Sequence, residues 1–231
     1  ANQFNPGSVI TQSWSVVGAG DYDGDGKSDL FWRNAADGQN IVWPSADGSQ
    51  KRSLTAITGL DWKVVASGDF DGDGRGDVFW RHATNGQNAI WWSGDYAART
   101  MEQQVSTAWI VAGAGDINGD GKDDVVWRNT ATGANIVWWS GKYAGFTNLT
   151  SVLTQAWEIV AVDDFDGNGK ADLFWRQRTT GENILWWNGD FATQVRELTV
   201  STAWKVVASG DYNGDGKADL LWRNGVTGAN I

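Results

Sequence analysis

The chain has 231 residues and a formal net charge of −10 at pH 7, and 41% of its residues are hydrophobic. This hydrophobic content suffices for a packed core, whereas the negative charge argues against nucleic acid and anionic membranes as partners. Cysteine is absent and His82 is the single histidine, which excludes disulfide scaffolds, zinc–thiolate sites and cysteine nucleophiles. No apolar run approaches the roughly 18 residues needed to span a bilayer, so no membrane insertion is expected.

An internal repeat of 47 or 48 residues accounts for the 30 glycines and the 17 tryptophans. Each copy has a strand that begins with Trp, an acidic loop, a strand that contains Trp-Arg, a turn that ends in Gly, and a strand with one or two Trp. The acidic loops begin at Asp21, Asp69, Asp116, Asp164 and Asp211. Because a fixed period of this length is typical of propellers, we expect one domain over residues 1–231.

The first copy predicts four strands in chain order, at residues 14–19, 29–34, 39–43 and 53–57. Short strands, glycine-rich turns and the lack of a helical period indicate an all-β chain. Four strands in about 45 residues are typical of one propeller blade. The sequence therefore predicts a five-bladed β-propeller with four-stranded blades.

The two ends of the chain favour closure of this ring. The sequence stops at Ile231, inside the third strand of the fifth repeat, and residues 7–12 have the pattern of an outer strand without a blade. We expect the N-terminal strand to complete the last blade, because an unpaired strand edge at each end would invite aggregation. The alternative is an open, truncated array.

The acidic loops read DYDGDGKSD, DFDGDGRGD, DINGDGKDD, DFDGNGKAD and DYNGDGKAD. Positions 1, 3, 5 and 9 carry carboxylate or amide oxygens, position 7 offers a backbone carbonyl, and glycines at positions 4 and 6 permit a sharp turn. This spacing suits Ca²⁺ better than Mg²⁺, and five structural calcium ions are predicted. The alternative is a set of solvated Asp–Gly hairpin turns.

The candidate calcium ligands occupy equivalent positions in the five loops. They are Asp21, Asp23, Asp25, Lys27 and Asp29; Asp69, Asp71, Asp73, Arg75 and Asp77; Asp116, Asn118, Asp120, Lys122 and Asp124; Asp164, Asp166, Asn168, Lys170 and Asp172; and Asp211, Asn213, Asp215, Lys217 and Asp219.

The loops, followed by D-L-F-W-R-N and G-x-N-I-x-W-W, resemble the FG-GAP/VCBS repeat family. The resemblance covers essentially the whole chain and implies a calcium-binding β-propeller in an extracellular setting. It does not fix a function, because that family includes adhesion modules, lectins and enzyme appendages. The chain begins at Ala1 rather than Met, from which we expect a processed or trimmed chain and a secreted protein.

Three sets of repeated residues are candidates for ligand contact, and each also has a packing interpretation. The second Trp of the third strand could stack on a sugar or pack between blades. The Arg that follows Trp could bind a ligand, stack on a neighbouring ring or pair with an Asp, and the Asn after the turn could bind sugar hydroxyls or the local backbone. These residues are Trp92, Trp139 and Trp187; Arg33, Arg81, Arg128, Arg176 and Arg223; and Asn40, Asn88, Asn135, Asn183 and Asn230.

The sequence favours a binding module over an enzyme. It lacks the G-x-S-x-G, P-loop and Rossmann motifs, and five full ligand sets are typical of closed structural metal sites. We expect a multivalent lectin, in which weak sites for carbohydrate or glycoprotein gain affinity from avidity. The alternative is a structural or protein-adhesion module from a larger secreted protein. The sequence does not predict the oligomeric state.

Overall fold

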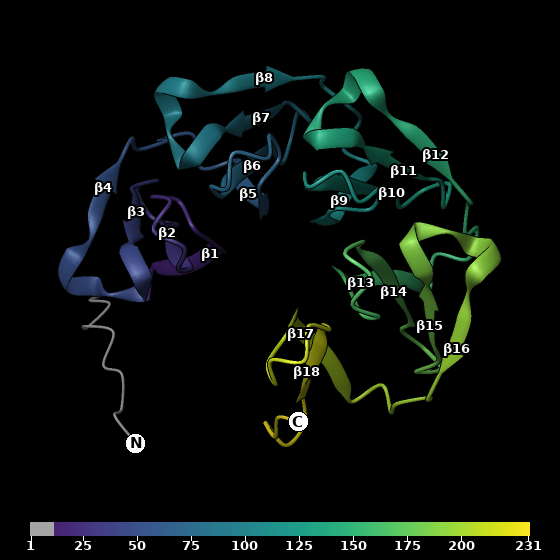
Figure 1. Ribbon diagram of the computed structural model, residues 1–231. Helices are drawn as coiled ribbons and strands as arrows, with labels where there is room; N and C mark the ends of the chain where they lie inside the picture. Colours follow the sequence, from purple (N-terminus) through teal and green to yellow (C-terminus); the bar gives the residue numbers. More distant parts are fainter. Residues whose placement is uncertain (1–11) are drawn as a thin grey trace. The chain divides into compact units, whose positions relative to one another are not determined.

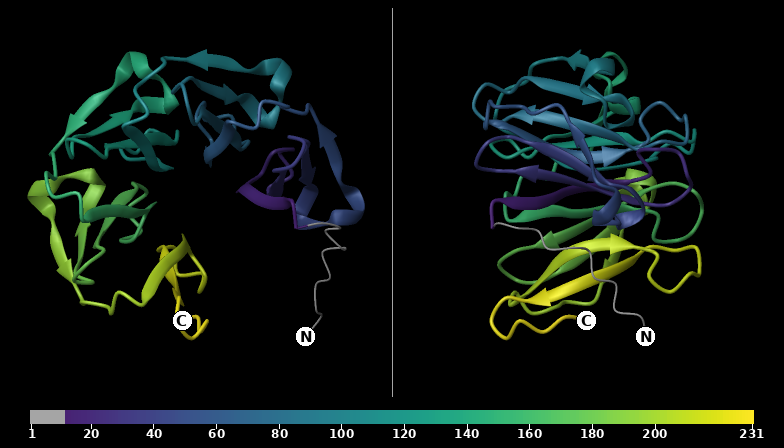
Figure 2. Two further views of the ribbon diagram at one scale, coloured as in Figure 1. Left: turned by 180° about the vertical axis from the view of Figure 1, so that it is seen from behind. Right: turned by 90° about the vertical axis from the view of Figure 1, so that its left-hand side faces the viewer.

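The computed structural model describes residues 12–231, in which every regular element is a β-strand or a short 3₁₀ turn. The all-β prediction is therefore confirmed for this part of the chain. Two compact units, Ala1–Thr107 and Ala108–Ile231, divide the repeats between them, and the strands of each can be followed in Figures 1 and 2. Among the described residues, no helix is long and apolar enough to cross a membrane.

The first unit contains repeats one and two, and each repeat is a four-stranded antiparallel sheet whose strands follow in chain order. The strands are β1 (Trp14–Gly20), β2 (Asp29–Asn34), β3 (Asn40–Trp43), β4 (Arg52–Leu54), β5 (Trp62–Gly68), β6 (Asp77–His82), β7 (Asn88–Trp91) and β8 (Thr100–Glu102). The 3₁₀ turns between third and fourth strands are η1 (Pro44–Ala46), η2 (Gly48–Gln50), η3 (Trp92–Gly94) and η4 (Tyr96–Ala98).

The second unit contains repeats three and four, with the same topology, and repeat five. Its strands are β9 (Trp109–Gly115), β10 (Asp124–Asn129), β11 (Asn135–Trp138), β12 (Thr147–Leu149), β13 (Trp157–Asp163), β14 (Asp172–Gln177), β15 (Asn183–Trp186), β16 (Val195–Glu197), β17 (Trp204–Gly210) and β18 (Asp219–Asn224). Its 3₁₀ turns are η5 (Trp139–Gly141), η6 (Tyr143–Gly145), η7 (Trp187–Gly189) and η8 (Phe191–Thr193).

Successive sheets within a unit pack face to face through apolar residues at alternate positions of their strands. In the first unit, Phe31 and Val42 of repeat one share a core with Trp80 and Trp91 of repeat two. The rings of Phe31 and Trp80 meet edge to face, with centroids 6.2 Å apart. Because side chains alternate between the two faces of a strand, successive apolar residues of the second strand pack on opposite faces of the sheet.

In each complete repeat, a tryptophan of the second strand contacts a tryptophan of the third strand, with ring planes tilted by 36–43°. Trp80 and Trp91 lie 4.6 Å apart between ring centroids, and the pairs in repeats one, three and four have the same spacing within 0.1 Å. Both rings of the pair in repeat two are almost completely buried. Packing therefore accounts for these two classes of tryptophan.

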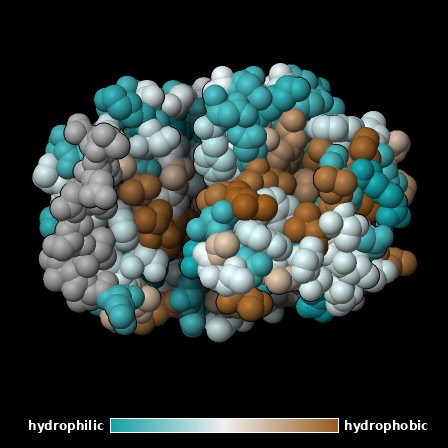
Figure 3. Space-filling model, turned by 90° about the horizontal axis from the view of Figure 1, so that it is seen from below, coloured by the Kyte–Doolittle hydropathy of each residue, from teal (hydrophilic) through white to brown (hydrophobic). Residues whose placement is uncertain are grey.

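Repeat five differs from the other four. Its sheet contains only β17 and β18, and the third strand predicted from the sequence is limited to a bridge between Arg223 and Asn230. Trp222 packs on repeat four, whereas Leu221, on the other face of β18, is 36% exposed. Figure 3 shows hydrophobic residues gathered in patches between hydrophilic ones on one face of the molecule.

The prediction of four-stranded blades thus holds for repeats one to four, and the fifth sheet is smaller than predicted. The fourth strand, predicted at residues 53–57, is shorter in the structure, where β4 spans Arg52–Leu54. The closing strand at residues 7–12 lies almost entirely outside the described residues. The closed five-bladed ring and the single domain over residues 1–231 therefore stay predictions.

The turn after the third strand has positive φ angles at two successive positions. In repeat one these are Ser45 and Ala46, at +47° and +59°, whereas the second position is glycine in repeats two to four. A left-handed conformation costs an L-residue roughly 1–2 kcal/mol, and glycine avoids this cost. Part of the gain is offset, because glycine gives the unfolded chain more conformational entropy. The substitution Ala46→Gly is therefore expected to raise the free energy of unfolding by about 0.5–1 kcal/mol.

Urea denaturation measures this prediction, with the reciprocal variant Gly94→Ala as the matched control. A Cβ atom at Gly94 would make only ordinary contacts, the closest at 3.4 Å from Tyr22, so the cost of this control is conformational. The control should lower the free energy of unfolding by about 1 kcal/mol. A destabilised Ala46→Gly variant would contradict the assignment of strain to this turn.

Candidate functional site

The first aspartate of each acidic loop holds the loop's own backbone. In repeat one, the Oδ1 atom of Asp21 accepts a hydrogen bond from Gly24 N at 2.6 Å, and Oδ2 accepts one from Gly26 N at 2.7 Å. Both glycines have a φ angle of +81°, a conformation that favours glycine over other residues. The predicted role of the glycines at positions 4 and 6 is therefore confirmed.

The last aspartate of loops one to four is held from two sides. Asp77 is 1% exposed, and its Oδ2 and Oδ1 atoms accept hydrogen bonds from Phe70 N at 2.8 Å and Ser93 N at 2.7 Å. The same two donors, one from loop position 2 and one from the turn after the third strand, serve Asp29, Asp124 and Asp172.

The second of these donors was not found by sequence reasoning. It belongs to Ser45, Ser93, Ser140 or Asn188, each of which has a positive φ angle. The recurrence of W-S-G, P-S-A or W-N-G directly after the third strand could have indicated it. This turn joins the acidic loop to the outer part of the same sheet.

Three of the loops bring three carboxylates together. In loops one, two and four, one oxygen each from positions 1, 3 and 9 lies within 4.8 Å of the other two. Oxygens bound to one Ca²⁺ ion lie at most about 5 Å apart, twice the usual Ca–O distance of 2.3–2.6 Å. These Asp clusters could therefore hold a metal, and their hard oxygen donors suit Ca²⁺. The clusters consist of Asp21, Asp23 and Asp29; Asp69, Asp71 and Asp77; and Asp164, Asp166 and Asp172.

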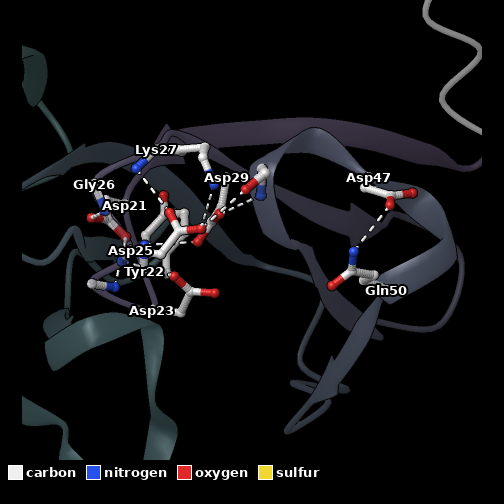
Figure 4. Close-up of polar contacts among 11 residues, drawn as sticks. Asp21, Tyr22, Asp23, Asp25, Gly26, Lys27, Asp29, Asp47 and Gln50 are labelled. Atoms are coloured by element: carbon white, nitrogen blue, oxygen red, sulfur yellow. Dashed lines mark hydrogen bonds and ion pairs between the residues drawn. The ribbon is translucent and has the colours of Figure 1, made fainter.

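The other loops differ at position 3, where Asn118 and Asn213 carry an amide oxygen in place of a carboxylate. At position 5 of loop one, the Oδ2 atom of Asp25 pairs with the Nζ atom of Lys27 at 3.1 Å. Figure 4 shows this pair beside Asp21, Asp23 and Asp29. Of the predicted ligands in this loop, positions 1, 3 and 9 are brought together, and position 5 makes a competing contact.

Burial changes the acidity of the last aspartate in these loops. It raises the pKa of Asp77 to about 7 and those of Asp124 and Asp172 to about 6, and neighbouring loop carboxylates add to the effect. The pKa of Asp29 is raised for the same reason. Such carboxylates are stabilised by a proton or by a cation within the loop.

The metal-free protein is therefore expected to become more stable on acidification from pH 7.5 to 5.5. A carboxylate whose pKa is higher in the folded than in the unfolded state binds extra protons on folding, so its contribution is lost as the pH rises through the folded pKa. One pKa unit corresponds to about 1.4 kcal/mol, so three such groups should raise the melting temperature by several degrees.

Melting curves of metal-depleted protein at three pH values measure this effect, and the same series in excess calcium is the control. In calcium the gain on acidification should disappear, because the ion already neutralises the loops. A melting temperature of the metal-free protein that falls between pH 7.5 and 5.5 would contradict the assignment.

The repeated arginines and asparagines form buried contacts with each other in repeats one to four. In repeat three, Arg128 Nη1 donates to Asn135 Oδ1 at 3.0 Å, and Arg128 Nη2 donates to the Val152 carbonyl at 3.0 Å. The Asn135 Nδ2 atom donates to the Thr150 carbonyl at 2.8 Å. The guanidinium lies 5.0 Å from the ring centroid of Trp175 in the next repeat. These contacts match the structural interpretation of both residues.

Equivalent contacts hold Arg33 to Asn40, Arg81 to Asn88 and Arg176 to Asn183, at 2.9–3.0 Å. Arg33 also stacks on Trp80, and Arg176 stacks on Trp222. In repeat five, Arg223 and Asn230 are exposed and their atoms lie 3.4 Å apart.

The second tryptophan of each Trp–Trp pair begins the 3₁₀ turn after the third strand, rather than lying within the strand as predicted, and it is half-buried. The indole N–H groups of Trp92 and Trp139 donate to the hydroxyls of Thr100 and Thr147, at 2.9 and 3.0 Å. Trp186 and Trp187 pack in the cores on opposite sides of their sheet, as the alternation of side chains predicts. Part of each ring in this class is therefore used for packing.

A groove recurs at equivalent positions between successive repeats, once in each unit. In the first unit it has a volume of about 140 Å³, and Arg33 and Lys63 are among its lining residues. In the second unit its volume is about 420 Å³, and it is lined by Ile110, Ala112, Arg128, Thr130, Gln155, Glu158, Ile159 and Arg178. Glu158 and Arg178 form an exposed ion pair at 3.9 Å in the larger groove.

Several solved structures resemble the chain at low sequence identity. BBS1N in complex with ARL6DN has a TM-score of 0.53 and 12% identity over 98% of this chain and 70% of that one. Virginiamycin B lyase from Staphylococcus aureus has a TM-score of 0.51 and 7% identity over 85% and 59%. The nidogen/laminin complex has a TM-score of 0.44 and 16% identity over 68% and 54%.

The chain thus spans only 54% and 59% of the length of the nidogen/laminin and lyase structures. The BBS1N and virginiamycin B lyase structures support the fold alone, because their sequence identity to this chain is low. No curated protein matches the sequence.

The repeats themselves match a known family along most of the chain. The profile of the FG-GAP-like repeat matches four overlapping segments, residues 21–80, 69–127, 116–175 and 164–222. Each segment runs from one acidic loop to the Trp-Arg strand of the next repeat, so it includes the Asp cluster and the packing tryptophans described above. The chain belongs to the FG-GAP-like repeat family.

Proposed function

We propose that this chain is a secreted, non-catalytic binding module that calcium stabilises and that holds carbohydrate in the grooves between successive repeats. The observation that carries the proposal is the recurrence of one groove at equivalent positions in both units. A ligand that fits one groove can meet related surfaces elsewhere on the same chain. Several weak sites of this kind gain affinity through avidity.

The groove of the second unit has the chemistry that a neutral, polyhydroxylated ligand needs. Thr130 and Gln155 offer both donors and acceptors, and the pair of Glu158 and Arg178 offers an acceptor beside a donor. Ile110 and Ile159 supply an apolar wall for the C–H face of a sugar. Arg128 is held by its own contacts and limits the depth of the groove rather than binding the ligand itself.

The tryptophans take a smaller part in this proposal than the sequence suggested. Trp92, Trp139 and Trp187 are half-buried, and two of them use their indole N–H group within the protein. The polar grooves therefore replace these rings as the main candidate sites for sugar.

Five calcium ions, one in each acidic loop, are proposed to stabilise the repeats. The oxygen clusters of loops one, two and four support this, and loops three and five have the same spacing with one amide oxygen. The ion would neutralise buried carboxylates and would take no part in a reaction. Calcium sites of extracellular modules bind in the range of about 10⁻⁴–10⁻³ M, which fits the proposed secretion.

A glycan array in millimolar calcium, repeated after chelation, tests the function. A defined family of bound glycans is expected in calcium, with loss of binding after chelation. A blank array with folded, calcium-loaded protein would contradict the lectin proposal and favour the alternative, a protein-adhesion or structural module.

Variants then locate the site. Glu158→Gln is expected to weaken binding of the best glycan, because it removes the acceptor of the groove's ion pair. Glu182→Gln is the matched control, since Glu182 also forms an exposed ion pair, with Arg196 at 3.2 Å, but lies outside the groove. Equal affinities of the two variants would contradict the assignment of the groove.

A further inference from the structure

A second kind of cavity lies in the first unit, and it shares no lining residue with the acidic loops or with the repeated groove. It has a volume of about 390 Å³ and lies between residues 56–59, which lead from β4 to β5, and the sheet of repeat two. Its aromatic lining consists of Trp62, Trp80, Trp91 and Tyr96. We call this cavity the Ala89 groove, after the residue that distinguishes its repeat.

Ala89 lines the groove at a position where repeats one, three and four carry isoleucine. In the register of each sheet this residue lies opposite the tryptophan of the second strand: Ala89 pairs with Trp80, as Ile136 pairs with Trp127 and Ile184 with Trp175. Isoleucine has three more side-chain carbons than alanine. Isoleucine at this lining position would therefore reduce the volume of the groove.

The aromatic residues of the groove differ in burial. Trp80 and Trp91 are 1% and 2% exposed, with ring centroids 4.6 Å apart and planes tilted by 36°, and the ring of Tyr96 meets Trp91 edge to face at 5.3 Å. Trp62 and Tyr96 are half-buried and offer the accessible aromatic surface. Met101, which also lines the groove, is 54% exposed. Small-molecule sites of about 300–1,000 Å³ commonly combine such apolar walls with a few polar groups.

The charge in the lining of the groove is positive. Arg99 is the only charged residue in its lining, in a protein of net charge −10. Its guanidinium lies 3.8 Å from the ring centroid of Tyr96, and its Nη1 atom donates to the Tyr96 carbonyl at 3.0 Å. Arg99 forms no ion pair with any described residue. A cation held in this way can pair with a carboxylate through its remaining N–H groups.

We propose that the Ala89 groove binds a small aromatic carboxylate, with the flat ring against the accessible surfaces of Trp62, Tyr96 and Met101 and the carboxylate on Arg99. A groove of about 390 Å³ has room for a fused aromatic ring, and the negative charge complements the single cation among the lining residues. This site is separate from the carbohydrate grooves and from the calcium loops, and the proposal does not depend on the function proposed above.

Isothermal titration of the calcium-loaded protein with 2-naphthoate tests the proposal, and 2-naphthylmethanol is the neutral probe of similar shape. Saturable binding of one naphthoate per chain is expected, with binding of the neutral probe about tenfold weaker. No saturable binding of naphthoate up to millimolar concentration would overturn the proposal. Equal affinity for both probes would overturn the role of Arg99.

Two variants and one control locate the ligand. Ala89→Ile should weaken naphthoate binding about tenfold or more, and it should fold normally because the other complete repeats carry isoleucine there. Arg99→Gln should reduce the preference for naphthoate over the neutral probe. Arg52→Gln removes an exposed arginine outside the groove and should leave both affinities unchanged. Wild-type affinity in a folded Ala89→Ile variant would overturn the location.

Discussion

In millimolar calcium the protein is expected to melt roughly 10 °C or more above the metal-depleted protein. Each loop without a cation holds three or four acidic groups, and in loops one to four the last of them is buried. With Kd values of about 10⁻⁴–10⁻³ M, 1 mM calcium stabilises the folded state by about 0.4–1.4 kcal/mol per site. One kcal/mol corresponds to about 2–4 °C in a chain of this size, so five occupied loops at the tighter end of this range reach the expected shift.

Differential scanning calorimetry with calcium, with magnesium and after chelation measures this shift, and magnesium should give a smaller one.

The paired variants Asp77→Asn and Asp71→Asn connect the effect to one loop. Asp77→Asn should lower the melting temperature strongly in calcium, because an amide N–H₂ group would face Phe70 N or Ser93 N, which now donate to the carboxylate. Asp71→Asn should cost little, since repeats three and five carry Asn118 and Asn213 there. A melting temperature unchanged by chelation would contradict the role given to calcium.

The substitution Arg128→Leu is expected to lower the free energy of unfolding by roughly 3–5 kcal/mol. The guanidinium joins three segments of repeat three, because it donates to Asn135 Oδ1 and to the carbonyls of Gly133, Val152 and Thr154. Leucine would leave these buried acceptors without that donor and would remove the stacking on Trp175. Each unsatisfied buried polar group costs about 1–3 kcal/mol.

Urea denaturation of Arg128→Leu and Arg223→Leu gives a matched comparison. Arg223 occupies the equivalent position in repeat five but is exposed, and its side-chain hydrogen bond to Asn230 Oδ1 is 3.4 Å long. Its substitution should change the free energy of unfolding by no more than about 0.5 kcal/mol. Similar costs for the two variants would show that the buried contacts of Arg128 are not what stabilises the repeat.

Much of the fold follows from local patterns that recur at a fixed spacing. The acidic loops predict their own turns, because Gly24 and Gly26 are needed where φ is positive and Asp21 accepts from their N–H groups. The strands follow from the alternation in D-L-F-W-R-N, which places the buried Phe31 and the half-buried Trp32 on opposite faces of β2. Five copies of one pattern make such local signals reliable.

The parts that the sequence did not predict depend on contacts between segments distant in the chain. The anchor from Ser93 N to Asp77 spans 16 residues and forms only when the turn after β7 has positive φ angles. The choice between ligand contact and packing for Arg128 depends on Trp175, which lies in the next repeat. The Ala89 groove arises from one residue that departs from the repeat, and a search for the common pattern overlooks such a departure.

Native mass spectrometry of the protein in millimolar calcium tests the central claim most directly, because it counts the ions bound to the folded chain. The account predicts a folded species that carries five calcium ions, with bound calcium lost in parallel with the melting temperature on chelation. A folded species without bound calcium, under conditions in which a known calcium protein retains its ions, would contradict the claim that these loops are calcium sites.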